Sequence, residues 1–229
     1  MADKESCIVL GVGPGLGAAV ARRFAAAGFK VALAARTAEK LAPIAGEIEA
    51  AGGTAAVYAV DATDEAQVAD LFERAEAELG PVGVAVYNAS GRVRKGIAEI
   101  GAEEFVEAWK RSCYGGFLLG REAARRMAPR GRGSILFTGA TASVKSYAGS
   151  AGFAVGKYGL RALAESMARE LQPKNVHVAH FVIDGGIGVD DGQARLEPDA
   201  IAETYYQTHA QHRSAWAWEV ALRPWVETF

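Results

Sequence analysis

The sequence predicts an α/β protein with a doubly wound sheet of seven mostly parallel strands and helices on both faces. Short runs rich in Val, Ile and Ala alternate with longer amphipathic stretches along the 229 residues. The apolar runs are nearly continuous, which is typical of parallel strands that are buried on both faces. The chain has no internal repeat, linker or low-complexity segment, so we expect one domain over residues 1–229.

The order of elements follows from these runs and from the turn residues between them. Gly28 is expected to stop the first helix, Asp64 to cap the third, and Gly80-Pro81 to end it. Right-handed crossovers then put a ligand crevice at the carboxyl ends of the strands. We expect strands at residues 7–10, 30–34, 54–60, 82–87, 134–137 and 176–183, an edge strand within 214–225, and helices at 16–27, 38–51, 65–79, 103–127 and 150–171, with one more beginning at Pro198.

Composition and charge exclude several classes of function. A net charge of -2 provides no basic footprint for nucleic acid. No apolar run is long enough to span a bilayer, and the polar start of the chain has no signal peptide. We therefore expect a cytoplasmic protein in which Cys7 and Cys113 are reduced. His209 and His212 lack an acidic cluster at ligand spacing, so no metal site is expected.

A glycine-rich turn follows the first strand, in the run Gly11-Val12-Gly13-Pro14-Gly15-Leu16-Gly17. Glycines in such a strand–turn–helix unit permit a tight turn and let the backbone approach a pyrophosphate. The helix that follows offers unpaired N–H groups to the anion. The turn therefore indicates a Rossmann-type dinucleotide site.

The spacing of Gly11, Gly15 and Gly17 resembles the short-chain dehydrogenase/reductase family, and the resemblance continues along most of the chain. Further matches are Asp61, the run 88–91 after the fourth strand (with Tyr87 and Ser90 departing from the family's Asn-Asn-Ala-Gly), the run 115–117, Lys157 and the run 183–187. The resemblance implies cofactor contacts at Gly11, Gly13, Pro14, Gly15, Leu16, Gly17, Arg36, Asp61, Ala62, Asn88, Ala89, Ser90, Lys157, Gly185 and Ile187.

Arg36, at the end of the second strand, favours NADP(H) over NAD(H). A carboxylate there would accept a hydrogen bond from the ribose 2′-hydroxyl, whereas an arginine fork pairs with a 2′-phosphate. The alternative is that Arg36 is a solvated residue at the start of a helix.

The family's catalytic Asn, Ser, Tyr and Lys correspond here to Ser112, Ala140, Phe153 and Lys157. The resemblance implies that the lysine holds the nicotinamide ribose, that the serine binds the substrate carbonyl and that the tyrosine transfers the proton. Only Lys157 keeps the family's residue type. The three replacements predict that the family's usual ketone reduction is not used.

Other side chains are candidates for the missing proton donor. Tyr147 is the first, because its loop borders the substrate pocket in the family. Asp184 is the second, as a half-buried carboxyl whose raised pKa would let it donate a proton, or alternatively a turn residue. Thr138 and Thr141 flank position 140 and are weaker candidates.

Two functions follow from this pattern. The first is an NADP(H)-dependent oxidoreductase that transfers hydride to or from a carbonyl or an activated C=C bond, with a non-standard proton donor. The second is a catalytically silent NAD(P)-binding protein that acts as a redox sensor or oligomer partner. The substrate is an unknown small molecule, and the aromatic tail and long helices predict a homodimer or homotetramer. A short polar loop at 188–195 predicts an open or partner-completed pocket.

Overall fold

The computed structural model describes residues 5–189 and 195–226. Within them, seven strands form one sheet in the order β3-β2-β1-β4-β5-β6-β7, and all six neighbouring pairs are parallel. The predicted fold class is therefore confirmed. The strands are β1 (Ser6–Leu10), β2 (Lys30–Ala35), β3 (Thr54–Ala59), β4 (Val82–Tyr87), β5 (Ser134–Thr138), β6 (His177–Ile183) and β7 (Glu219–Leu222).

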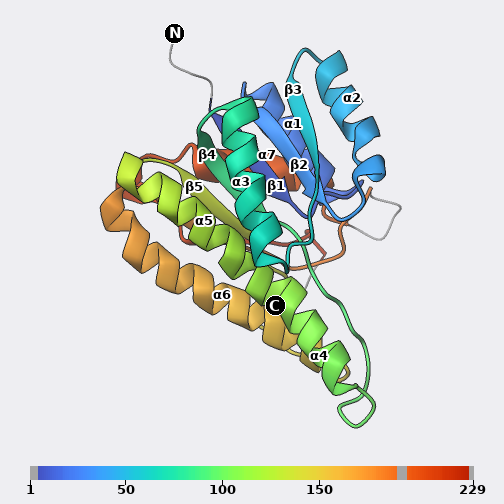
Figure 1. The fold of residues 1–229 in the computed structure, drawn as a ribbon. Coiled ribbons are helices and arrows are strands. Elements are labelled where there is room, and N and C mark those ends of the chain that lie inside the picture. Colours follow the sequence, from blue (N-terminus) through green and yellow to red (C-terminus); the bar gives the residue numbers. More distant parts are fainter. Residues whose placement is uncertain (1–4, 190–194, 227–229) are drawn as a thin grey trace.

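Helices cover both faces of the sheet, as Figure 1 shows. One core lies between the strands and α1 (Leu16–Ala26), α2 (Ala42–Ala50) and α7 (Pro198–His209). The other lies between the strands and α3 (Glu65–Leu79), α5 (Gly115–Arg130) and α6 (Ala151–Leu171). Strands buried on both faces explain why the apolar runs are continuous rather than alternating.

The predicted helix boundaries have visible causes. The Asp64 carboxylate accepts a hydrogen bond of 3.0 Å from the backbone N–H of Gln67, which caps α3. Gly28 follows α1 with a φ of 94°, and Gly80 follows α3 with a φ of 96°. Few residues other than glycine adopt such angles, so these positions end the helices.

The helix expected at 103–127 is present without a break, but it contains a π-helical segment that was not predicted. Helix α4 covers Ala102–Trp109, a π-helical segment follows over Lys110–Tyr114, and α5 begins at Gly115. The hydroxyl of Tyr87 donates a 2.6 Å hydrogen bond to the carbonyl oxygen of Arg111 within that segment. Tyr87 thus ties the end of β4 to the π-helical segment.

Two other expected elements are shorter than predicted. The helix expected at 38–51 is a 3₁₀ turn over Ala38–Lys40 followed by α2, because Pro43 fits only the first turn of a helix. The strand within 214–225 is reduced to β7, which lies at the edge of the sheet as expected. The ring of Trp216, before β7, stacks on His177 at 4.7 Å instead of joining the sheet.

Several expectations about chemistry can be set beside the described residues. Cys7 and Cys113 are free thiols, and Cys7 is buried. Among the described residues, no cluster of three His, Cys, Asp or Glu side chains has metal-binding geometry. No helix in the described part of the chain is long and apolar enough to cross a membrane. Most of the short polar loop at 188–195, namely residues 190–194, lies outside the described residues.

Candidate functional site

The glycine-rich turn forms a cradle at the carboxyl end of β1. A Cβ atom at Gly11 would lie 2.3 Å from the backbone nitrogen of Ala89, and one at Gly17 would lie 2.8 Å from Cα of Val12. These two glycines therefore allow neighbouring backbone segments to approach. Gly13 and Gly15 instead face open space, where no heavy atom lies within 4 Å of an added Cβ.

The open side of this turn borders a hollow of about 400 Å³. The unpaired N–H groups in the first turn of α1 lie at the hollow, and the N-terminus of a helix is a site that binds anions. The residues of this turn therefore fit a pyrophosphate. The predicted contacts Gly11, Gly13, Gly15, Leu16, Gly17, Arg36, Asp61, Ala62, Asn88, Ala89 and Ser90 all line the hollow.

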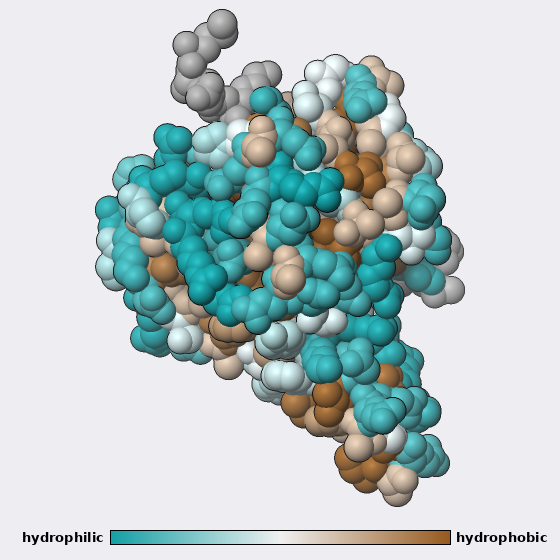
Figure 2. Space-filling model, in the orientation of Figure 1, coloured by the Kyte–Doolittle hydropathy of each residue, from teal (hydrophilic) through white to brown (hydrophobic). Residues whose placement is uncertain are grey.

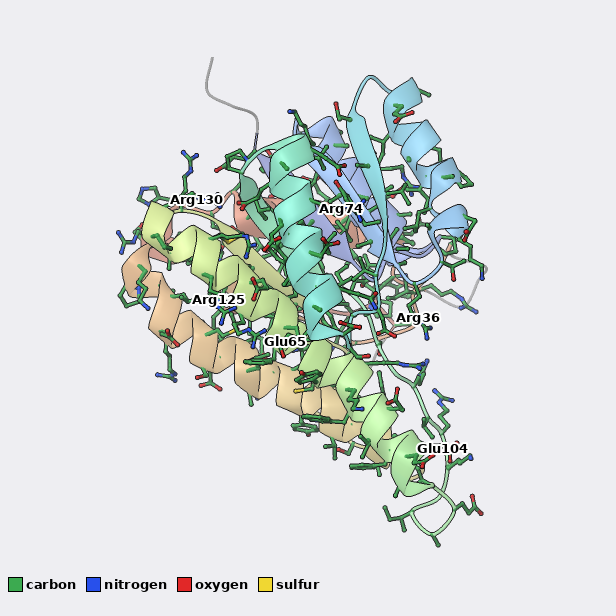
Figure 3. All side chains as sticks on the ribbon, in the orientation of Figure 1. Arg36, Glu65, Arg74, Glu104, Arg125 and Arg130 are labelled. Atoms are coloured by element: carbon green, nitrogen blue, oxygen red, sulfur yellow. The ribbon has the colours of Figure 1, made fainter. Side chains whose placement is uncertain are left out.

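Arg36 and Asp61 lie on the rim of this hollow. Arg36 is exposed just beyond the end of β2 (Figure 3), where its side chain is accessible to a ligand. Burial acts to raise the pKa of Asp61, but hydrogen bonds from the N–H and hydroxyl of Thr63 outweigh it and lower the pKa. Asp61 is thus held as a carboxylate.

Asn88 joins the hollow to a second, larger cavity. Its side-chain amide donates a 2.9 Å hydrogen bond to the carbonyl oxygen of Gly11, which ties the end of β4 to the glycine-rich turn. Asn88 and Ser90 line both the hollow and the neighbouring cavity of about 1210 Å³. The two spaces therefore form one cleft across the carboxyl ends of β1, β4 and β5.

Lys157 lies at the wall of the larger cavity and is 3% exposed. Its ammonium donates a 2.7 Å hydrogen bond to the carbonyl oxygen of Thr138, at the end of β5. Burial lowers the pKa of Lys157 to about 8, because desolvation disfavours the charged form.

The three positions that the resemblance marks as substituted lie around Lys157. Phe153 and Ala140 line the same cavity, where neither offers a proton to a substrate. Ser112 is fully buried in the π-helical segment, and its hydroxyl hydrogen-bonds both the N–H and the carbonyl of Gly91. Ser112 therefore anchors the loop after β4 and does not line the cavity.

The expectation that Asp184 has a raised pKa was wrong. Burial acts in that direction, but hydrogen bonds from Thr141 and Arg223 outweigh it and hold the pKa below its usual value. The Arg223 guanidinium lies 2.5 Å from the Asp184 carboxylate. A carboxylate in an ion pair has no proton to donate at neutral pH, so Asp184 does not fit the role of proton donor.

The remaining candidate donors differ in accessibility. Tyr147 lines the cavity from the loop before α6, and its side chain is half exposed. Thr138 uses its hydroxyl to accept a 2.9 Å hydrogen bond from Tyr205 of α7, on the other face of the sheet. The hydroxyl of Thr141 is bonded to Asp184. Of the candidate proton donors, Tyr147 is therefore the one whose side chain is accessible from the cavity.

Gly185 and Ile187 line the larger cavity rather than the hollow. Gly185 has a φ of 158°, and a Cβ there would lie 2.7 Å from Pro224. The predicted contacts at the glycine-rich turn, by contrast, lie at the hollow. The predicted cofactor site therefore extends from the hollow into the larger cavity.

The larger cavity has a cationic side that the sequence predictions did not include. Arg92, Arg94 and Lys95 line it from the loop after β4. The signal was available, since three cations follow closely on the run 88–91. His180 of β6 was not predicted either; its side chain is fully buried beneath Gly139, where an added Cβ would lie 2.3 Å from its Nε2.

Comparison with known proteins agrees with this geometry. The family model described as short chain dehydrogenase matches residues 5–191. A 3-oxoacyl-[acyl-carrier-protein] reductase of Bos taurus is 31% identical over 185 residues, which cover 80% of this chain and 76% of the relative. The MabA 3-oxoacyl-[acyl-carrier-protein] reductase of Mycobacterium bovis is 30% identical over 86% of this chain and 76% of its own length.

Solved structures match over nearly the whole chain. A short-chain dehydrogenase from Rhodopseudomonas palustris superposes with a TM-score of 0.89 at 43% identity, covering 96% of this chain and 99% of that one. A metagenomic short-chain oxidoreductase in complex with NADP gives a TM-score of 0.86 at 30% identity, covering 96% and 97%.

Proposed function

Because this chain belongs to the short-chain dehydrogenase family, whose relatives are oxidoreductases, we propose that it is an NADP(H)-dependent oxidoreductase with a non-standard proton donor. Hydride would pass to or from a carbonyl or an activated C=C bond. The observation that supports this most is the continuous cleft, which joins the glycine-rich turn to the buried Lys157 through Asn88.

The dinucleotide would be held along that cleft. Its pyrophosphate fits the turn at Gly13 and Gly15, where the backbone faces open space. Arg36 would pair with a 2′-phosphate, and Asp61 would contact the adenine. Lys157 would hold the nicotinamide ribose. The bound nicotinamide supplies or accepts the hydride.

The substrate half of the cleft favours chemistry that requires little from a proton donor. Phe153 has a phenyl ring at the position where a tyrosine would protonate a ketone. Ala140 has a methyl group at the position where a serine would orient it. Reduction of an enone leaves a delocalised carbanion, which can take its proton from water. We propose Tyr147 as the donor where one is needed, because its side chain reaches the cavity. The relatives named as 3-oxoacyl reductases support a carbonyl substrate as well.

Two measurements test this function. Fluorescence titration with NADPH and NADH should show saturable binding that is tighter for NADPH. A panel of ketones and enones, with NADPH consumption as the readout, should then reveal turnover. Activity that is unchanged in Tyr147→Phe would remove Tyr147 as the donor, and absence of binding by both nucleotides would refute the proposal.

The second candidate is a catalytically silent dinucleotide-binding protein that senses redox state or assembles with other copies. The specific observation that favours it is the pairing of Phe153 with Ala140 around a retained Lys157. Tight NADPH binding without turnover on any member of the panel is the result expected from this alternative.

We also propose that the single domain forms a homodimer or homotetramer. The rings of Trp109, Tyr114 and Phe117 stack along α4 and α5 at centroid distances of 5.9 and 6.1 Å, and Trp109 and Phe117 are more than one-third exposed. Val155 and Tyr158 of α6 are exposed as well. Figure 2 shows a largely hydrophilic surface with apolar residues gathered on the projecting end that carries α4. Exposed aromatic surface of this kind is typical of an interface.

A further inference from the structure

Two cations flank the ring of Phe153 in the larger cavity. Nζ of Lys157 lies 5.9 Å from the ring centre and the guanidinium carbon of Arg92 lies 5.4 Å from it. Lys157 comes from the same helix, one turn later, whereas Arg92 comes from the loop after β4. A ligand that lies against this ring therefore meets positive charge from two elements.

The cavity as a whole is cationic. Its described lining has four cationic side chains, Arg92, Arg94, Lys95 and Lys157, and a single carboxylate, that of Glu99. The Glu99 carboxylate accepts a hydrogen bond from the N–H of Gly96 in its own loop. This excess of positive charge is local, because the whole chain has a net charge of -2.

The cations differ in whether the protein already neutralises them. Lys95 is paired with Glu104 of α4, whose two oxygens lie 2.7 and 2.8 Å from its ammonium. Arg92 and Arg94 have no ion pair or hydrogen bond within residues 5–189 and 195–226. Figure 3 shows Glu104 at the projecting end of the molecule, beside the loop that carries these cations.

Lys157 contributes a charge of a different kind. Its ammonium is buried and bonded to the carbonyl oxygen of Thr138, with no carboxylate among the described residues within ion-pair distance. A desolvated cation interacts more strongly with an anion than a surface cation does, because the surrounding dielectric is lower.

We propose that the cavity binds a substrate bearing a carboxylate, which Arg92 holds over Phe153 with Arg94 at the rim, while the buried charge of Lys157 beside the same ring adds to the attraction. The planar fork of Arg92 suits a carboxylate, and the apolar ring beneath it suits the carbon skeleton of the substrate. This inference rests on the proposed function in taking the larger cavity as the substrate site.

Calorimetric titration with 4-oxo-4-phenylbutanoate and with its amide, which differ in charge and little in shape, tests the inference. The acid should bind about tenfold more tightly than the amide, as expected for one charge-assisted contact. Arg92→Gln should abolish that preference and Arg92→Lys should retain part of it. Lys95→Gln is the matched control and should leave the preference intact, because Glu104 already neutralises Lys95.

Equal binding of the acid and the amide, or detectable binding of neither, would overturn the inference. So would a preference for the acid that survives Arg92→Gln combined with Arg94→Gln. The titrations are run without nucleotide and with NADP, and circular dichroism checks that each variant is folded. NADPH binding measured on the same samples separates the two proposals, since its absence refutes the proposed function while the comparison of acid and amide remains valid.

Discussion

Nζ of Lys157 lies 5.9 Å from the centre of the Phe153 ring, one helical turn away on the same face of α6. The ammonium makes a cation–π contact with that ring and donates its hydrogen bond to the carbonyl of Thr138. The end of β5 thus holds the retained lysine through a backbone carbonyl, whichever residue stands at position 153. This relationship leaves room for a phenol to be restored there.

Replacing Phe153 with Tyr and Ala140 with Ser together should create or increase ketone reduction with NADPH. A positioned general acid contributes about 10²- to 10⁴-fold to a rate, and the serine would orient the carbonyl. Each single variant should gain less, and Phe153→Leu should gain nothing. Steady-state kinetics on the ketone panel measure the change. A double variant with no gain would show that the cavity itself has diverged from ketone chemistry.

Replacing Arg36 with Ser should weaken NADPH binding by about tenfold or more, because one charge-assisted contact to the 2′-phosphate is lost. NADH binding should change little, since NADH has no such phosphate. Lys40→Ser provides the control, as another exposed cation in the neighbouring 3₁₀ turn. Fluorescence titration distinguishes the two cofactors, and equal losses for both would contradict the role given to Arg36.

The buried Lys157 should make stability rise with pH. Its pKa falls from 10.5 to about 8 on burial, so the unfolded chain binds more protons between these values. Stability then increases as pH rises through that window. Relative to Lys157→Met, the wild-type protein should gain roughly 2–3 kcal/mol of unfolding free energy between pH 7 and 10. Urea unfolding of both proteins measures this, and parallel pH profiles would argue against the lowered pKa.

A charge placed on the exposed aromatic face should disrupt assembly. Phe117→Glu would put a carboxylate into the surface that we propose is buried between copies, where an unpaired charge is costly. Light scattering after size exclusion should show a smaller particle than for the wild type. Ala50→Glu serves as the control, because Ala50 is also exposed but lies on α2, away from this face. A monomeric wild-type protein would contradict the proposed assembly.

The fold could be predicted from the sequence because its signals are local. Continuous apolar runs, the Asp64 cap and the stops at Gly28 and Gly80 each depend on a few neighbouring residues. The π-helical segment was not predictable in this way. It accompanies a hydrogen bond between Tyr87 and Arg111, residues 24 positions apart, and hydrophobic periodicity does not register such a contact.

The candidate site divides along the same line. Motif spacing was enough to select the glycine-rich turn, Asn88 and Lys157, which line one cleft in the structure. The prediction for Asp184 failed because its protonation depends on Arg223, a partner 39 positions away. The cationic cavity was missed for a similar reason, since the loop after β4 places Arg92 against Phe153 across 61 positions (153 − 92).

By itself, the sequence determined the order of strands and helices, the glycine cradle and the residue types at positions 112, 140, 153 and 157. These features follow from backbone preferences and from the spacing of neighbouring residues, both of which can be read without knowing the fold. The tertiary structure alone decided which charges are neutralised, which hydroxyls are engaged and which cations face the cavity. Protonation and access depend on partners brought together by packing, and that information exists only in the folded chain.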